Sequence, residues 1–201
     1  AALAITTSQP ITMLYAPDHG LTDLPLPDAP HLMQLIVPGN ALTALNLSGV
    51  PVLEELNCSD NQLTALTTGD CPNLVSLDCA NNQITSILTS KNTSLQILNC
   101  AGNKLSALGV SSKDIKAVWC QNNQLTKIVL STGADPQQLV AFNNQITTLN
   151  LTGKANLQEL WLDNNALTTL DISSSSVRTL SASNNQLTSI THNTDDKKSM
   201  E

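Results

Sequence analysis

Four cysteines recur at an almost constant interval along the chain. Cysteine is the residue type here that could hold a metal ion, form disulfides or act as a nucleophile. The four are Cys58, Cys79, Cys100 and Cys120, spaced by 21, 21 and 20 residues. Residues repeated at such a period occupy equivalent positions in successive units, so their side chains would form a line spaced by about 4.8 Å. A line cannot converge on one tetrahedral zinc site, and neighbouring Cβ atoms would lie farther apart than the roughly 3.5 to 4.5 Å of a disulfide. We therefore expect buried free thiols and no metal site.

The other residues that could do chemistry are isolated. Cys71 falls in a turn between units and is predicted to be the one thiol that meets solvent, as an inert surface thiol. His19, His31 and His192 lie in irregular or terminal segments, with no serine or cysteine nucleophile at a strained turn. A glycine-rich phosphate loop is also missing from the sequence. The sequence predicts no catalytic residue, no cofactor and no enzyme activity.

The cysteines belong to a motif that runs through most of the chain. Its clearest copy is residues 77–87, with the pattern L-x-C-x-x-N-x-L-T-x-L and Ile at the last two Leu positions. Self-similarity at a period near twenty predicts a solenoid, in which each unit packs only against its neighbours. We predict an N-terminal lead over 1–10, about nine repeats over 11–190 and a polar tail over 191–201. The motif asparagine recurs at Asn40, Asn61, Asn82, Asn103, Asn123, Asn144, Asn165 and Asn185, and His19 replaces it in a degenerate first copy.

Each unit is predicted to contain one short strand and one turn. The segment before the asparagine alternates with period two, which indicates a strand, and successive units would make these strands parallel. The asparagine follows the strand, where its amide can donate to and accept from the backbone of its own and adjacent coils. We therefore predict a structural asparagine ladder. The remaining eight to ten or so residues are too few and too rich in Ser, Thr, Gly and Pro for a helix, so extended or 3₁₀ segments are expected there.

The sequence resembles leucine-rich repeat proteins. Residues 74–87 match the pattern L-x-x-L-x-C-x-x-N-x-L-T-x-L, and the 21-residue period is similar to the short bacterial class called IRREKO. The resemblance covers roughly residues 11–190 and departs at His19 and at Pro136, where Leu is expected. It implies an α/β-class solenoid, right-handed, with a parallel β-sheet on the concave face. It also implies a protein partner and favours a secreted, cell-surface or host-translocated bacterial protein.

All four aromatic residues fall at positions that alternate with the inward ones, so they would point outward from the concave sheet. Three of them lie on successive units with Val140 and would form one apolar patch, the kind of surface that dominates binding energy in interfaces. The alternative is that the rings stack across strands and stiffen the sheet. Gln121, Gln138, Lys116 and Arg178 would belong to a polar rim. The predicted partner-binding residues are Trp119, Val140, Phe142, Trp161, Glu159, Asp163 and Tyr15.

The charge pattern argues against two classes of partner. The formal net charge is −7 and the nine basic residues are scattered, so no cationic track is offered to nucleic acid or to an anionic membrane. No apolar run approaches the roughly 18 residues needed to span a bilayer. An acidic stretch comprises Glu54, Glu55, Asp60 and Asp78. Such a stretch is usually a solvated face; a basic partner or a cation is the more specific alternative.

Three functional hypotheses follow. The first is a non-catalytic protein-recognition module that binds its partner on the concave sheet. The second is a structural segment that associates end to end, because Val177, Leu180, Leu187 and Ile190 in the last unit have only the polar tail to cover them. The third is the recognition domain of a longer bacterial effector or enzyme whose catalytic part lies elsewhere.

Overall fold

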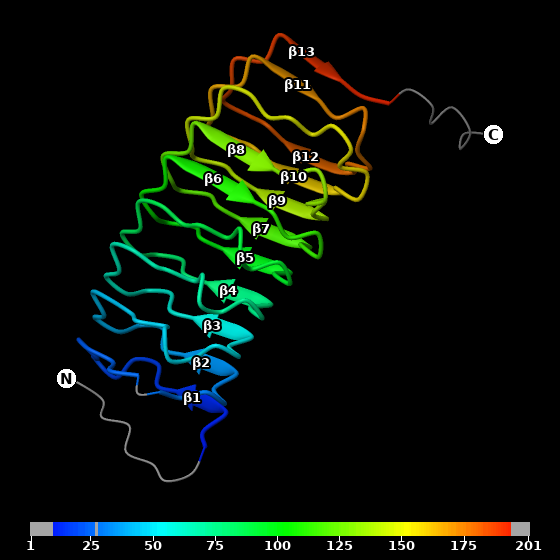
Figure 1. Ribbon diagram of the computed structural model, residues 1–201. Coiled ribbons are helices and arrows are strands. Elements are labelled where there is room, and N and C mark those ends of the chain that lie inside the picture. The colour runs from blue at the N-terminus through cyan, green and yellow to red at the C-terminus, as the bar shows by residue number, and fades with distance from the viewer. Residues whose placement is uncertain (1–9, 27, 194–201) are drawn as a thin grey trace.

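The protein is a single stack of coils (Figure 1). The computed structural model describes residues 10–26 and 28–193, and within these ranges it contains strands and turns but no helix. The predicted parallel-sheet solenoid is therefore confirmed. Most of the predicted lead (1–10) and of the predicted tail (191–201) lies outside the described residues.

One parallel sheet runs the length of the stack. Each of its strands pairs with the strand of the next unit in unbroken register, as Leu56 does with Leu77. The sheet has nine strands in the order β1-β2-β3-β4-β5-β7-β9-β10-β12. Their bounds are β1 (Met13–Tyr15), β2 (Gln34–Ile36), β3 (Glu55–Asn57), β4 (Ser76–Asp78), β5 (Ile97–Asn99), β7 (Ala117–Trp119), β9 (Gln138–Val140), β10 (Glu159–Trp161) and β12 (Thr179–Ser181).

After four of the asparagine turns the chain is extended as well. In two places it forms a separate parallel pair, β6 (Ala107–Val110) with β8 (Lys127–Leu130) and β11 (Thr169–Asp171) with β13 (Ser189–Thr191). Of the two alternatives predicted for this side, extended segments are present, and no 3₁₀ segment occurs in the described ranges. Segments this short and this rich in Ser, Thr and Gly cannot offset the cost of nucleating a helix.

The core inside the coils is aliphatic. In the nine-stranded sheet, the middle residue of each strand from β2 to β10 points inward and is buried. All four aromatic residues lie in the described ranges, and none of their side chains is buried. Pro136 is buried at the position where the repeat has leucine, so the unit keeps its register. At the equivalent position Leu74 donates its N–H only to the turn carbonyl of Cys71 (3.2 Å). Proline therefore removes a turn bond and no ladder bond.

The motif asparagines join each coil to the one before it. Asn82 Nδ2 donates to the carbonyl of Cys58 in the preceding unit (3.0 Å) and to that of Cys79 in its own unit (3.1 Å), and its Oδ1 accepts from Leu63 N–H (2.9 Å). These bonds satisfy backbone groups that the turn removes from the sheet. The same three kinds of bond are made by Asn40, Asn61, Asn103, Asn123, Asn144, Asn165 and Asn185.

The residue before each motif asparagine, or before His19, has a left-handed backbone. Only Gly, Asn and Asp adopt this conformation at low cost, and only these three types occur there. The positions are Asp18, Gly39, Asp60, Asn81, Gly102, Asn122, Asn143, Asn164 and Asn184, with φ between 53° and 67°. Several of their side chains bond to the equivalent residue of the neighbouring unit, as Asn143 Nδ2 does to Asn122 Oδ1 (2.7 Å). The exposed edge of the turn is thus a second polar ladder.

The cysteine column is buried and reduced. Cys58, Cys79, Cys100 and Cys120 are all free and buried, and burial raises the pKa of each thiol, for Cys120 to about 12. Each of four successive coils contributes one of these sulfurs, so the four sulfurs lie along the stack and do not converge. The column is therefore a set of small core residues.

The prediction for Cys71 is wrong, because its side chain is fully buried (0% exposed). Its N–H donates to Thr68 O as Val50 N–H does to Leu47 O, which places the two residues at the same position of successive units. The sequence suggested an exposed turn, but this turn directs one side chain inward. Burial raises the pKa of the Cys71 thiol to about 11.

Candidate functional site

The outer face of the nine-stranded sheet carries most of the exposed apolar residues. The first and third residues of its strands point away from the core and are partly exposed, while the middle residue is buried. Eight large hydrophobic residues are exposed in the described part of the chain. Five of them lie in these strands or directly before one: Met13, Tyr15, Met33, Ile97 and Trp161. Apolar side chains gathered on one face mark a site of interaction.

Four of the predicted partner-binding residues form an apolar cluster across β7, β9 and β10. Trp119 pairs with Val140, and Val140 pairs with Trp161, so these side chains form one row across the sheet. Phe142 lies two residues beyond Val140 and therefore on the same side of the chain. We call Trp119, Val140, Phe142 and Trp161 the aromatic patch. Trp161 is 36% exposed and the other three are half-buried.

Glu159 and Asp163 flank the aromatic patch, whereas Tyr15 does not. Glu159 begins β10, and Asp163 follows Trp161 by two residues. Tyr15 ends β1, which is five strand positions from β7 in the sheet. At about 4.8 Å per strand, Tyr15 is roughly 24 Å from Trp119. The structure therefore brings six of the seven predicted residues together and leaves Tyr15 on a different part of the same face.

A glutamine fixes the orientation of Trp119. The indole Nε1–H donates to Gln138 Oε1 on the next strand, and Gln138 Nε2 donates to Glu159 Oε2 on the strand after that (2.6 Å). Three successive strands thus contribute one continuous hydrogen-bonded chain. A ring held in this way loses little side-chain entropy when a partner covers it.

A recess of about 330 Å³ lies beside the Trp119 indole. It exists because Ala117 stands between two larger residues, Ile97 and Gln138, in the same row of the sheet. Such a volume is at the lower end of ligand pockets and suits one side chain of a partner. The sequence did not identify the recess, although a small residue between two large ones in an outward row is a usable signal. Its lining comprises Ile97, Lys116, Ala117, Trp119, Gln137, Gln138, Gln158 and Glu159.

Asp163 is held in place by two serines of the next unit. Its Oδ1 accepts from Ser181 Oγ (2.7 Å) and from Ser183 N–H (2.8 Å). Partial desolvation by itself raises the pKa of Asp163, but the hydrogen bonds from Ser181 and Ser183 together outweigh it, so the pKa lies below its ordinary value. Close by, Gln121 Oε1 is buried and accepts no hydrogen bond from any described group.

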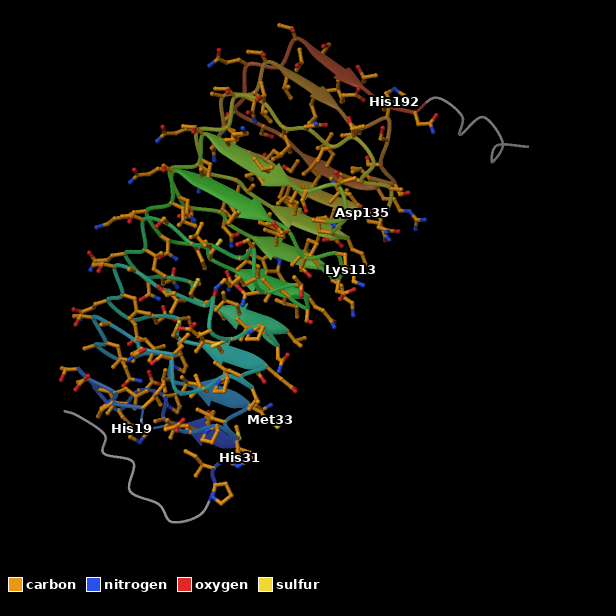
Figure 2. All side chains as sticks on the ribbon, viewed as in Figure 1. His19, His31, Met33, Lys113, Asp135 and His192 are labelled. Carbon is orange, nitrogen blue, oxygen red and sulfur yellow. The ribbon has the colours of Figure 1, made fainter. Side chains whose placement is uncertain are left out.

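The three histidines lie far apart in the described part of the chain (Figure 2). His19 and His31 lie in the N-terminal coils and His192 lies at the opposite end of the stack (Figure 2). In the described ranges, no group of three or more His, Cys, Asp or Glu residues is arranged to hold a metal ion. Those ranges also contain no helix that could cross a bilayer.

Comparison with family profiles places repeat sequences in the regular part of the chain. The profile described as "Leucine Rich repeats (2 copies)" matches residues 51–92 and 72–113, and the one described as "Leucine Rich Repeat" matches residues 156–177. No curated protein matches the chain in sequence.

Solved structures of bacterial proteins share the fold. The functional domain of InlJ from Listeria monocytogenes, which includes a cysteine ladder, is 31% identical with a TM-score of 0.83 over 88% of this chain and 40% of its own. YopM from Yersinia enterocolitica is 27% identical with a TM-score of 0.70 over 85% of this chain and 41% of its own. The Leptospira interrogans protein LIC12759 has a TM-score of 0.70 at 22% identity, covering 83% and 48%, which shows the fold alone. The chain spans less than half the length of these structures.

Proposed function

The chain is a leucine-rich repeat protein of the bacterial type with repeats of 20 or 21 residues, and we propose that it is a non-catalytic module that binds a partner protein through the aromatic patch on the outer face of its sheet. Members of this family are generally protein-interaction modules. What they bind differs from member to member, so the binding surface has to be argued from this chain's own residues.

The observation that carries the proposal is the aromatic patch. Trp119, Phe142 and Trp161 lie on the outer face, whereas the core inside the coils is aliphatic. Tryptophan is among the residues that contribute most binding energy in interfaces, and a truncation typically costs about 2 kcal/mol or more when a partner buries the ring. Stacking across strands stiffens the sheet but does not require exposure.

The surroundings of the aromatic patch support binding of a folded or extended protein segment. Gln138 holds the Trp119 indole in one orientation, and the recess above Ala117 gives an adjoining position for a partner's apolar side chain. Lys116 and Glu159 line the same recess and would orient the segment.

The test is capture of a partner from the native source by the wild-type chain and by the Trp119→Ala/Trp161→Ala variant. We expect the variant to lose at least tenfold in affinity for the captured protein, because it lacks two rings that the partner would bury. Leu88→Ala/Val129→Ala is the matched control, since these residues are 78% and 46% exposed but lie outside the nine-stranded sheet. Equal binding by the wild type and the tryptophan variant would refute the proposal.

A second candidate is that this module is the recognition domain of a longer bacterial effector. Coverage of only 40% and 41% of the InlJ and YopM chains favours it, and a YopM from Yersinia pestis is described as a leucine-rich effector protein. Sequencing the complete reading frame tests this candidate. A reading frame that encodes no further domain on either side of this one would argue against it.

A further inference from the structure

The charges of the chain are divided unequally along the solenoid. Residues 1–90 contain eight Asp and Glu and no Lys or Arg, whereas residues 91–201 contain eight Asp and Glu and all nine Lys and Arg. The formal charges of the two parts are thus −8 and +1, which together give the net charge of −7. The coils that carry β1 to β4 therefore produce a negative potential that the rest of the molecule does not share.

A separate apolar cluster lies on the sheet at this negative end. Tyr15 is 65% exposed, Met13 50% and Met33 40%. Met13 and Tyr15 are the two outward residues of β1, and Met33 N–H donates to Thr12 O directly before them (2.8 Å). We call Met13, Tyr15 and Met33 the N-terminal patch, and Figure 2 shows Met33 near the start of the stack.

Acidic residues adjoin the N-terminal patch. Glu54 N–H donates to Met33 O (2.9 Å), so the two residues are neighbours. Glu55 pairs with Gln34 in the sheet and accepts from its Nε2 (3.0 Å). Asp78 is the outward residue one strand further on. We call Glu54, Glu55 and Asp78 the acidic strip.

The hydrogen bonds and charges decide what could cover this surface. Asp78 uses both carboxylate oxygens, for Ala80 N–H (3.0 Å) and Asn99 Nδ2 (3.1 Å), so the acidic strip does not converge on a cation. A second copy of the chain that met this surface with its own negative end would be repelled, as would a nucleic acid. A positively charged protein segment with an apolar side chain complements both the acidic strip and the N-terminal patch.

We propose that the N-terminal patch and the acidic strip bind a lysine- or arginine-rich segment of a partner protein, with an apolar side chain of that segment seated on Tyr15 and the methionines. This deepens the proposed recognition function and rests on it, because it identifies the chemistry of a second contact on the same face. The surface from β1 to β4 spans three strand spacings, about 14 Å, which an extended segment of about five residues covers.

The probe for this proposal is a fluorescent, capped peptide of about ten residues in which lysine alternates with leucine, compared with one in which glutamate alternates with leucine. Fluorescence anisotropy is measured with the full chain at about pH 7.5. We expect the lysine peptide to bind and the glutamate peptide not to bind. Affinity should fall as salt is raised, because exposed charges are screened.

Matched variants separate this surface from general attraction to a negative chain. Glu54→Gln/Glu55→Gln removes two charges from the acidic strip and should weaken the lysine peptide about three- to tenfold. Asp28→Asn/Asp70→Asn removes two charges from exposed residues that adjoin the buried turn residues Ala29 and Cys71, away from the sheet, and should leave affinity within about twofold. Tyr15→Ser should weaken binding, and Leu88→Ser, at a residue that is 78% exposed outside the sheet, should not.

Equal losses from the two charge pairs, or no binding of the lysine peptide by the wild-type chain, would overturn the proposal. A change in molar mass by light scattering on Tyr15→Ser would also overturn it, in favour of self-association through the N-terminal patch. Trp119→Ala/Trp161→Ala should leave the affinity for the lysine peptide unchanged. The experiment can therefore refute binding at the N-terminal patch and the acidic strip without refuting partner binding at the aromatic patch, and the reverse.

Discussion

Trp119 donates its indole N–H to the side-chain oxygen of Gln138, and these two residues lie on neighbouring strands. Gln138 therefore acts on the aromatic patch without belonging to it. The bond gives an exposed face one side chain whose orientation is set before any partner arrives.

Replacing Gln138 should free the indole while leaving the fold intact. Gln138→Leu keeps the size of the side chain but removes the bonds to Trp119 and Glu159, at a cost of about 1 to 2 kcal/mol in unfolding free energy. In a Trp161→Phe background, we expect the near-ultraviolet dichroism of Trp119 to decrease and its fluorescence to be quenched more readily. Gln34→Leu is the control. Gln34 occupies the same row of the sheet and donates a hydrogen bond to Glu55, but it makes no hydrogen bond to an indole. Unchanged Trp119 spectra would show that the bond does not hold the ring.

The asparagine ladder should be most costly to break in the middle of the stack. Asn82→Ala leaves the backbone groups of Leu63 and Cys58 without partners in a buried turn, at about 1 to 3 kcal/mol for each. Asn185 makes equivalent bonds but is only half-buried, so water replaces part of what Asn185→Ala removes. We expect a loss near 3 kcal/mol or more for the first variant and about 1 kcal/mol for the second by urea unfolding. Equal losses would contradict the role of burial.

The buried thiols should make the protein less stable in alkaline solution. An unfolded thiol ionises near about pH 8.5, whereas the Cys71 thiol has its pKa raised to about 11 in the folded chain. The contribution of this thiol to stability is therefore fully present below about pH 8.5, and it decreases as the pH rises from there through about 11. Cys71→Val, which copies Val50 of the preceding unit, should reduce that slope. In the native protein all five cysteines should resist a thiol reagent at pH 8. Rapid labelling of Cys71 would contradict its burial.

Asp163 should change stability with pH in the opposite direction to the buried thiols. Its pKa is lowered in the folded chain, so its contribution to stability is present above about pH 3.9, the unfolded value, and is lost as pH falls through the folded value. Ser181→Ala removes one of the donors to its carboxylate and should raise the pKa of Asp163, measured by NMR titration of the side-chain carbon. A wild-type Asp163 that titrates at the ordinary value would contradict the hydrogen bonds described above.

Much of this fold can be predicted because the repeat applies one rule many times. The period, the alternation before each asparagine and the small residues at the cysteine position are enough to assign strands, core and outward rows. The left-handed backbone conformation of the residue before each motif asparagine could have been predicted too. Paired asparagines such as Asn81 with Asn82 indicate it, since asparagine tolerates that conformation.

The part of each coil that leads from the asparagine turn back to the next strand of the nine-stranded sheet was less predictable, because polar residues occupy inward positions there. Cys71 follows a Gly-Asp pair and precedes a proline, which reads as an exposed turn. Lys154, in the same part of its unit, is 2% exposed and satisfies its ammonium partly through Ser131 O (2.8 Å). The recess beside Trp119 was missed for another reason. It depends on the size difference between side chains of neighbouring strands, which the period alone does not report.

Each motif asparagine reaches only the coil before it, and this has a consequence for how such a chain can evolve. Inserting or deleting one whole unit by gene duplication or recombination leaves every remaining amide with an equivalent partner. The number of coils can therefore drift between lineages at little energetic cost, while substitutions in the outward rows alter what is recognised.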